Sequence, residues 1–228
     1  MIVREPPYDM VGLFADLDMQ NFFEALIERG QDHRRGCSRP MRWRSLRDPR
    51  RDTVWREPER VLGPFLDQQT RFLVVWDHQG SGAEKRDPEK VEARVEDRLK
   101  KQGVPAANVM ALALVPELEA LFRPVWDRIK KLVCRERGML PPDDALILER
   151  AKRYDPGLSF PADPQQALDE QPKEMFGALV AIARLRRAAP LYRRIGERVS
   201  LRRLKNHAAA ARLARHIASW FPRQPARA

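Results

Sequence analysis

The sequence predicts an α/β protein with a mainly parallel sheet, flanking helices and a basic, helical C-terminal region. Short apolar runs alternate with segments of helical periodicity up to about Gly138. Such alternation is typical of parallel strands joined by crossover helices. After Gly138 the strand pattern ends and only helical periodicity remains. We therefore expect an α/β domain at residues 1–138 and a helical, basic region at residues 139–228.

Three apolar runs are expected to form the strands of this sheet. Residues 10–15, 71–76 and 109–115 are almost entirely apolar, as strands are when both faces of a sheet are covered. A fourth, short strand is possible at residues 41–44, inside an Arg-rich segment with little periodicity. Ligand sites of parallel sheets lie at the carboxyl ends of the strands, so the residues that follow these runs are candidate site residues.

Apolar residues recur at helical spacing in the segments between and after these runs, and Pro or Gly residues bound most of them. Helices are expected at residues 19–29, 58–69 and 87–103, after Pro116, and at residues 143–153, 171–187, 190–198 and 207–221.

The net charge of +11 is concentrated in the last quarter of the chain. Residues 173–228 hold 14 Lys and Arg against 2 Asp and Glu, whereas residues 1–172 hold 29 against 30. Such clustering suggests a polyanion or an acidic protein as partner. The alternative is a solvated helical face without a partner.

Composition also bounds the location and the cysteine chemistry. No run reaches the roughly 20 apolar residues of a membrane span, and the N-terminus lacks a signal-peptide pattern. We expect a cytoplasmic protein without a membrane partner. Cys37 and Cys134 lack metal-ligand spacing and are expected to be free structural thiols.

Carboxylates follow each of the three main strands. Asp16 and Asp18 follow the first, Asp77 the second, and Glu117 and Glu119 the third. If the strands are parallel, these acids meet at one rim, where they either hold a divalent cation such as Mg²⁺ or Mn²⁺ or have raised pKa values. Metal-assisted phosphoryl chemistry is one use of such a site. The alternative is that each acid caps the helix that follows it.

The order of these motifs resembles Toprim-like proteins, and most closely the fourth protein of the bacterial methylation-associated defence system. The resemblance rests on motifs along most of the chain: the D-x-x-G-x-G loop at 77–82, P-E-L-E at 116–119, P-K at 172–173, Tyr192, V-S-L-R-R at 199–203 and W-F at 220–221. It implies a cytoplasmic anti-phage defence component with other defence proteins as partners.

The resemblance also implies roles for the acids. Toprim enzymes use an acid after the first strand as general acid/base, which points to Asp16 or Asp18, and a D-x-D pair for Mg²⁺, which points to Asp77. Gln79 stands where the second Asp belongs, so Glu117 or Glu119 would have to complete the metal site. Two hypotheses follow: an Mg²⁺-dependent nuclease with catalytic Asp16, Asp18, Asp77 and Glu117, or a catalytically degenerate scaffold that binds nucleic acid or partner proteins.

Two further features carry predictions. Gly80 and Gly82 either bring backbone N–H groups to a phosphate or only make a turn, and the turn is the favoured interpretation. In the tail, Leu191, Ile195 and Val199 form an apolar stripe that should be buried, so the basic residues point elsewhere. The candidates for binding nucleic acid, DNA or RNA, or an acidic partner are Arg193, Arg194, Arg198, Arg202, Arg203 and Lys205.

Overall fold

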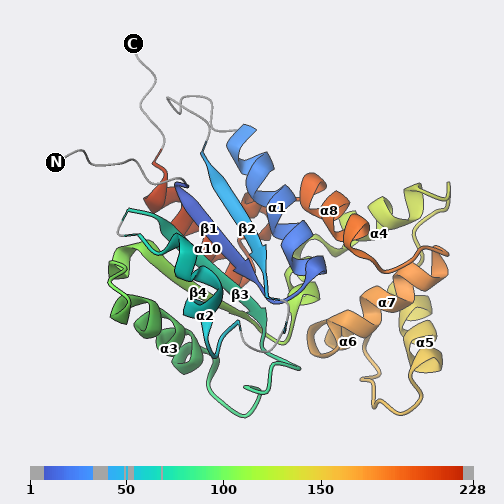
Figure 1. Ribbon diagram of the computed structural model, residues 1–228. Coiled ribbons are helices and arrows are strands. Elements are labelled where there is room, and N and C mark those ends of the chain that lie inside the picture. Colours follow the sequence, from blue (N-terminus) through green and yellow to red (C-terminus); the bar gives the residue numbers. More distant parts are fainter. Residues whose placement is uncertain (1–7, 33–40, 49, 51–53, 68, 223–228) are drawn as a thin grey trace.

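A four-stranded sheet lies at the centre of the chain (Figure 1), whose computed structural model describes residues 8–32, 41–48, 50, 54–67 and 69–222. The strands are β1 (Met10–Phe14), β2 (Trp43–Arg47), β3 (Arg71–Asp77) and β4 (Val109–Leu114). Their order is β2-β1-β3-β4, and every neighbouring pair is parallel. The α/β class and the parallel sheet that the sequence predicts are confirmed.

Helices cover both faces of the sheet. The helices α2 (Pro58–Leu62) and α3 (Pro88–Lys101) lie on the near face in Figure 1, and α10 (Ala208–Trp220) lies behind the sheet. Alternate residues of β3 belong to two different apolar cores, with Val74 packed towards α3 and Val75 towards the opposite face. Because both faces are covered, the strand is an uninterrupted apolar run.

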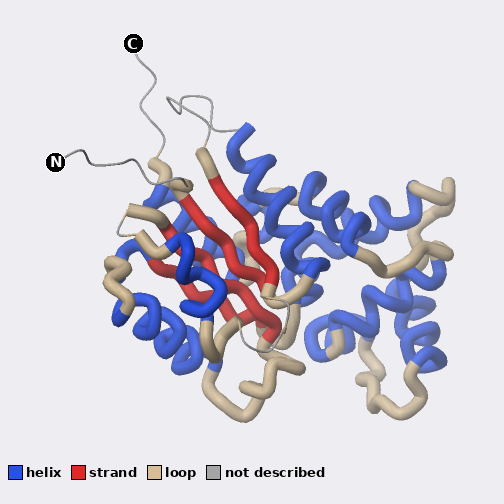
Figure 2. Tube along the Cα trace, viewed as in Figure 1, coloured by secondary structure: helices blue, strands red, loops and turns tan. Residues whose placement is uncertain are grey.

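The C-terminal half is helical, and Figure 2 shows no strand in the described chain after β4. The remaining elements are α1 (Leu17–Asp32), α4 (Trp126–Arg135), α5 (Asp144–Tyr154), α6 (Pro164–Glu170), α7 (Pro172–Ile182), α8 (Ala189–Arg198), α9 (Leu201–Leu204) and the 3₁₀ helices η1 (Gly63–Phe65), η2 (Ala106–Asn108) and η3 (Leu118–Val125). Helix α1 lies beside the sheet together with α8, while α4 to α7 form a helical lobe at its side (Figure 1). None of the helices in the described part of the chain combines the length and apolar character needed to cross a membrane.

One apolar core connects the sheet with the C-terminal helices. Phe22 of α1 packs edge-on against Phe122 of η3, which in turn contacts Phe176 of α7 and Tyr192 of α8. The domain boundary near Gly138 stays a prediction. The side chains on its two sides share this core.

Several elements differ from the sequence prediction for local reasons. Strand β2 lies at Trp43–Arg47 rather than at residues 41–44, and it is only half-buried because it is an edge strand. Helix α2 ends at Leu62 because Pro64 cannot donate the next helical hydrogen bond. The segment after β4 is 3₁₀ rather than α-helical and contains Pro124. Cys134 is a buried free thiol, as expected, and Cys37 lies outside the described residues.

Helices α1 and α8 approach so closely that Gly196 is required at their contact. A Cβ atom there would lie 2.4 Å from the carbonyl oxygen of Phe22 and 2.9 Å from Cβ of Ala25. Gly177, in α7, has no atom within 4 Å of its added Cβ. The two glycines are both helical, but only Gly196 has no room for a Cβ atom, so Gly177 can serve as its control.

We expect Gly196→Ala to lower the free energy of unfolding by about 1–3 kcal/mol, because a buried backbone contact must open. Gly177→Ala is the control and should raise it by up to about 1 kcal/mol, since alanine favours helix more than glycine. Urea unfolding followed by circular dichroism measures both. A Gly196→Ala protein as stable as the wild type would contradict the packing of α8 on α1.

Candidate functional site

The carboxyl ends of β1, β3 and β4 bring the predicted acids together at one rim of the sheet. Asp16 follows β1, Asp77 is the last residue of β3, and Glu117 and Glu119 follow β4. Asp77 Oδ1 accepts a hydrogen bond of 2.7 Å from the backbone N–H of Leu118, which joins the β3 and β4 ends directly. The negative charges of Glu119, Asp16 and Glu117 all act on Asp77. The convergence that parallel strands predict is therefore present.

Asp77 has a strongly perturbed carboxyl group. Its removal from water raises its pKa well above the usual range, the charges of Glu119, Asp16 and Glu117 raise it further, and only the Leu118 N–H group lowers it. No described cation pairs with this carboxyl group. Asp77 therefore keeps its proton over a wider pH range than a solvated aspartate does.

Cations from α7 and from the segment between α7 and α8 neutralise the two glutamates. Glu117 is 4% exposed, and its Oε2 lies 2.8 Å from Nζ of Lys173 at the start of α7. Glu119 is 2% exposed and accepts hydrogen bonds from Arg187 Nη2, at 2.8 Å, and from the Tyr192 hydroxyl. Burial raises the pKa of Glu117, although Lys173 opposes that rise. Both glutamates are parts of ion pairs that hold α7 and α8 against the sheet.

The helix-capping interpretation holds for Asp16 but not for Glu117. Asp16 Oδ1 accepts a 2.8 Å hydrogen bond from Met19 N at the start of α1. Asp18 lies in the first turn of the same helix, where a negative charge is favourable. Glu117 precedes η3 but makes no side-chain cap bond and pairs with Lys173 instead.

This donor set does not fit Mg²⁺ or Mn²⁺. Among the residues that the structure describes, no three His, Cys, Asp or Glu side chains are placed to hold a metal ion. Of the predicted ligands, Glu117 and Glu119 already bind cationic side chains, and Asp77 accepts a backbone N–H group. The catalytic roles predicted for Asp16, Asp18, Asp77 and Glu117 stay predictions.

The glycine loop after β3 makes a turn. Gly80 and Gly82 have φ angles of +76° and +77°, which favour glycine. Gly82 N donates to Glu84 Oε1 at 3.0 Å, and the backbone N–H groups of Gly82, Glu84 and Gly80 lower the pKa of Glu84. The loop amides bind a carboxylate of the chain itself. His78, the first residue of this loop, is buried, with 7% of its surface exposed.

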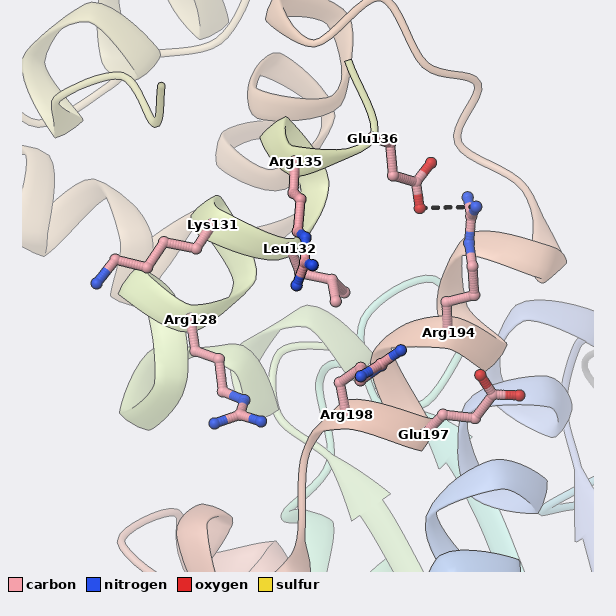
Figure 3. A pocket seen from close by; sticks show the side chains of 8 residues that line it. All are labelled: Arg128, Lys131, Leu132, Arg135, Glu136, Arg194, Glu197 and Arg198. Atoms are coloured by element: carbon pink, nitrogen blue, oxygen red, sulfur yellow. Dashed lines mark ion pairs between the residues drawn. The ribbon is translucent and has the colours of Figure 1, made fainter. Parts of the chain in front are cut away.

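A groove lined by basic residues lies between α4, α8 and α9. One lobe of about 550 Å³ is lined by Arg128, Lys131, Leu132 and Arg135 of α4, Glu136, and Arg194, Glu197 and Arg198 of α8 (Figure 3). Arg128 also lines a second lobe of about 480 Å³, together with Arg202, Arg203, Lys205 and Asn206. The two lobes adjoin at Arg128, and together they are called the groove.

Most of the positive charge in this groove has no described counter-charge. The four acids in the lining pair with basic groups: Asp127 and Asp144 with Lys130, Glu136 with Arg194, and Glu197 with Arg193. Arg123 pairs with Asp169. The basic lining residues without a carboxylate partner among the described residues are Arg128, Lys131, Arg135, Arg198, Arg202, Arg203 and Lys205. Burial and the charges of Arg203, Arg29 and Arg198 lower the pKa of Arg128, as expected for crowded cations.

The basic tail residues predicted from the sequence divide into two groups. Arg198, Arg202, Arg203 and Lys205 line the groove. Arg194 also lines the groove but pairs with Glu136 at 2.7 Å, whereas Arg193 lies outside the lining and forms ion pairs of 3.2 Å with Glu24 and 2.9 Å with Glu28 on α1. The apolar stripe of Leu191, Ile195 and Val199 is buried, as predicted.

Sequence reasoning missed two sets of residues. Arg128, Lys131 and Arg135 lie on one face of α4, and their spacing of three and four residues is the signal that could have found them. Lys173 and Arg187 pair with acids 56 and 68 residues earlier in the chain, and no local pattern indicates such pairs.

Comparison of the chain with protein-family models, with curated proteins and with solved structures finds no match. The acidic rim and the basic groove are therefore interpreted from their own geometry.

The raised pKa of Asp77 yields a prediction about stability. The pKa of Asp77 is higher in the folded than in the unfolded chain. Below about pH 4 the carboxyl group is protonated and does not lower the free energy of unfolding, whereas it lowers this free energy increasingly as the pH rises towards the folded pKa. Asp77→Asn keeps an acceptor for Leu118 N. We expect it to raise Tm at pH 8 by at least about 2 °C, the shift that 1 kcal/mol causes in a chain of this size, and to leave Tm unchanged near pH 4.

Thermal melts monitored by circular dichroism across this pH range measure the effect. Asp97→Asn, at an exposed acid on α3, is the control and should show no gain that grows with pH. A lower Tm for Asp77→Asn at pH 8 would mean that the ionised carboxylate stabilises the fold.

Proposed function

We propose that this chain is a non-catalytic, nucleic-acid-binding component of a bacterial anti-phage defence system, and that it binds the phosphate backbone along the groove between α4, α8 and α9. The observation that carries the proposal is the set of seven basic groove residues without a described carboxylate partner. Phosphates neutralise such clustered charge and release counterions from the nucleic acid, which is the main source of non-specific affinity.

The chemistry of the lining favours a phosphate backbone over an acidic protein. Protein interfaces depend on buried aromatic or aliphatic anchors at their centre. Leu132 is the partly buried apolar side chain of the α4–α8 lobe, and the Trp126 ring in the second lobe is 5% exposed. Arginine forks, in contrast, match phosphate oxygens with two parallel hydrogen bonds. Contacts to phosphates carry no direct sequence information, so a groove that binds through these basic side chains should bind nucleic acid independently of its sequence.

The ion pairs at the acidic rim support a binding role over a catalytic one. A phosphoryl-transfer site needs carboxylates that are free to hold hard cations. Here Glu117 and Glu119 bind Lys173 and Arg187 instead, and Gln79 stands where a second aspartate belongs. A Toprim-like scaffold with a degenerate site accounts for both features, and the ordered motifs of the sequence support the place of this scaffold in a defence system.

Binding to nucleic acid should depend on the groove and on salt. We expect Arg128→Glu/Arg198→Glu to weaken binding of a 20-nucleotide DNA or RNA at least about tenfold. It should also lower the slope of log K against log[salt] by about 1–2, because two phosphate contacts are lost. Fluorescence anisotropy at a series of NaCl concentrations measures both quantities.

The control for charge is Lys101→Glu/Lys152→Glu, which makes the same change at two exposed lysines outside the groove. It should keep nearly the wild-type affinity and slope. Binding that is independent of salt, or equal losses in the two double variants, would contradict the groove as the binding site.

Protection against phage should follow the groove and not the acidic rim. In cells that carry the gene with its neighbouring genes, Asp77→Asn should keep plaque counts at the wild-type level, because the proposed role needs no ionised acid there. Arg128→Glu/Arg198→Glu should raise plaque counts at least about tenfold, in line with the expected loss of binding. An Asp77→Asn protein that folds normally yet loses protection would favour the metal-dependent nuclease over the proposed role.

A further inference from the structure

A second basic pocket lies on the opposite face of the sheet from the groove. It is formed where the chain after β2, the glycine loop after β3 and helix α3 meet, and its lining includes Trp55, Arg56, Gly82, Arg86 and Arg94. Trp55 belongs to the apolar core on the α3 face, whereas the groove helices α4 and α8 belong to the other core. Both loops leave the carboxyl ends of parallel strands, where ligands of α/β proteins bind.

The ring of Trp55 orders two guanidinium groups of this pocket. Trp55 is 4% exposed, and its Nε1 donates a 2.9 Å hydrogen bond to the carbonyl oxygen of Ser81. Arg56 lies 5.1 Å and Arg86 5.5 Å from the centre of this ring. Stacking on a fixed ring holds each guanidinium group while its N–H edge stays available to an anion.

Gly82 provides the space for one of these guanidinium groups. An added Cβ at Gly82 would lie 2.8 Å from Arg56 Nη2, and its φ of +77° also favours glycine. The glycine loop thus makes its turn and at the same time admits Arg56 against its backbone. This second role was not indicated by the sequence.

The charge of the pocket is not balanced by its own acids. Arg98 pairs with Glu59, and Glu57 pairs with Arg60 at 2.6 Å. Glu84 is bound by the backbone of the glycine loop and does not line the pocket. Arg56, Arg86 and Arg94 have no carboxylate partner within the described parts of the chain. Three guanidinium groups match the charge of a diphosphate group, and a volume of about 380 Å³ leaves room for the rest of a small molecule.

We propose that this pocket binds the diphosphate group of a small molecule through Arg56, Arg86 and Arg94. The ligand does not stack on Trp55, because that ring is buried and carries two guanidinium groups. Recognition therefore rests on phosphate oxygens, for which planar guanidinium forks are the preferred donors in proteins. The site is independent of the nucleic-acid groove and does not require it.

Isothermal titration of the full chain with inorganic pyrophosphate tests this site. We expect pyrophosphate to bind at one site, and this binding should persist in the groove variant Arg128→Glu/Arg198→Glu. Arg86→Met and Arg94→Met should each weaken the binding at least about tenfold, since each removes a charge-assisted contact. Both arginines are exposed, and circular dichroism checks that each variant folds. Lys90→Met, at an exposed lysine one turn before Arg94 and outside the lining, should bind within about twofold of the wild type.

Three results would overturn the proposal. The first is binding that is unchanged in both Arg86→Met and Arg94→Met, or absent altogether. The second is binding that is lost in the groove variant, which would place pyrophosphate in the groove. The third is an equal affinity for citrate, which would show attraction of any small polyanion rather than recognition of phosphates. Persistence in the groove variant supports this site even if nucleic acid fails to bind there.

Discussion

The carboxylate of Glu119 constrains how the C-terminal helices pack on the sheet. It lies at the carboxyl end of β4 with 2% of its surface exposed, and a buried carboxylate is costly unless a cation and hydrogen bonds satisfy it. Arg187, between α7 and α8, and Tyr192, on α8, supply both. The Tyr192 ring also packs against Phe122 and Phe176, so the polar contact is continuous with the apolar core. Loss of either partner would leave a buried charge unsatisfied.

Once α8 is held in this way, its other faces acquire separate roles. Gly196 faces α1 at a distance that excludes a Cβ atom, and Arg193 pairs with Glu24 and Glu28 beside that contact. Arg194 and Arg198 face α4 across the groove (Figure 3). The same helix therefore closes the acidic rim on one side and forms a wall of the basic groove on another. An arginine on a helix packed in this way is presented rigidly, which lowers the entropy lost when it binds phosphate.

Much of the fold could be predicted from the sequence, because β1, β3 and β4 are apolar runs with acids at their ends and parallel pairing brings those ends together. Strand β2 begins two residues later than the sequence predicts and extends to Arg47, because an edge strand with half-buried residues gives a weak pattern. The chemistry of the acids could not be predicted in the same way. Their cations come from Lys173 and Arg187, beyond the expected boundary near Gly138, and contacts of that sequence separation depend on tertiary structure. The position of the acids could be predicted from local sequence patterns, whereas their pairing with cations could not.

The charge surplus of the tail is smaller in the folded chain than its composition indicates. Several of its basic residues neutralise acids of residues 1–172: Lys173 pairs with Glu117, Arg187 with Glu119, Arg193 with Glu24 and Glu28, Arg194 with Glu136, and Arg212 with Glu92. Other tail residues line the groove without such partners. They lie there together with Arg128, Lys131 and Arg135 of α4, which belong to residues 1–172, a segment that is nearly neutral by composition. Pairing within the fold therefore occupies Glu117 and Glu119, two acids that a metal would need, and it leaves seven basic groove residues without a carboxylate partner among the described residues. A polyanion is the ligand that such a distribution of charge favours.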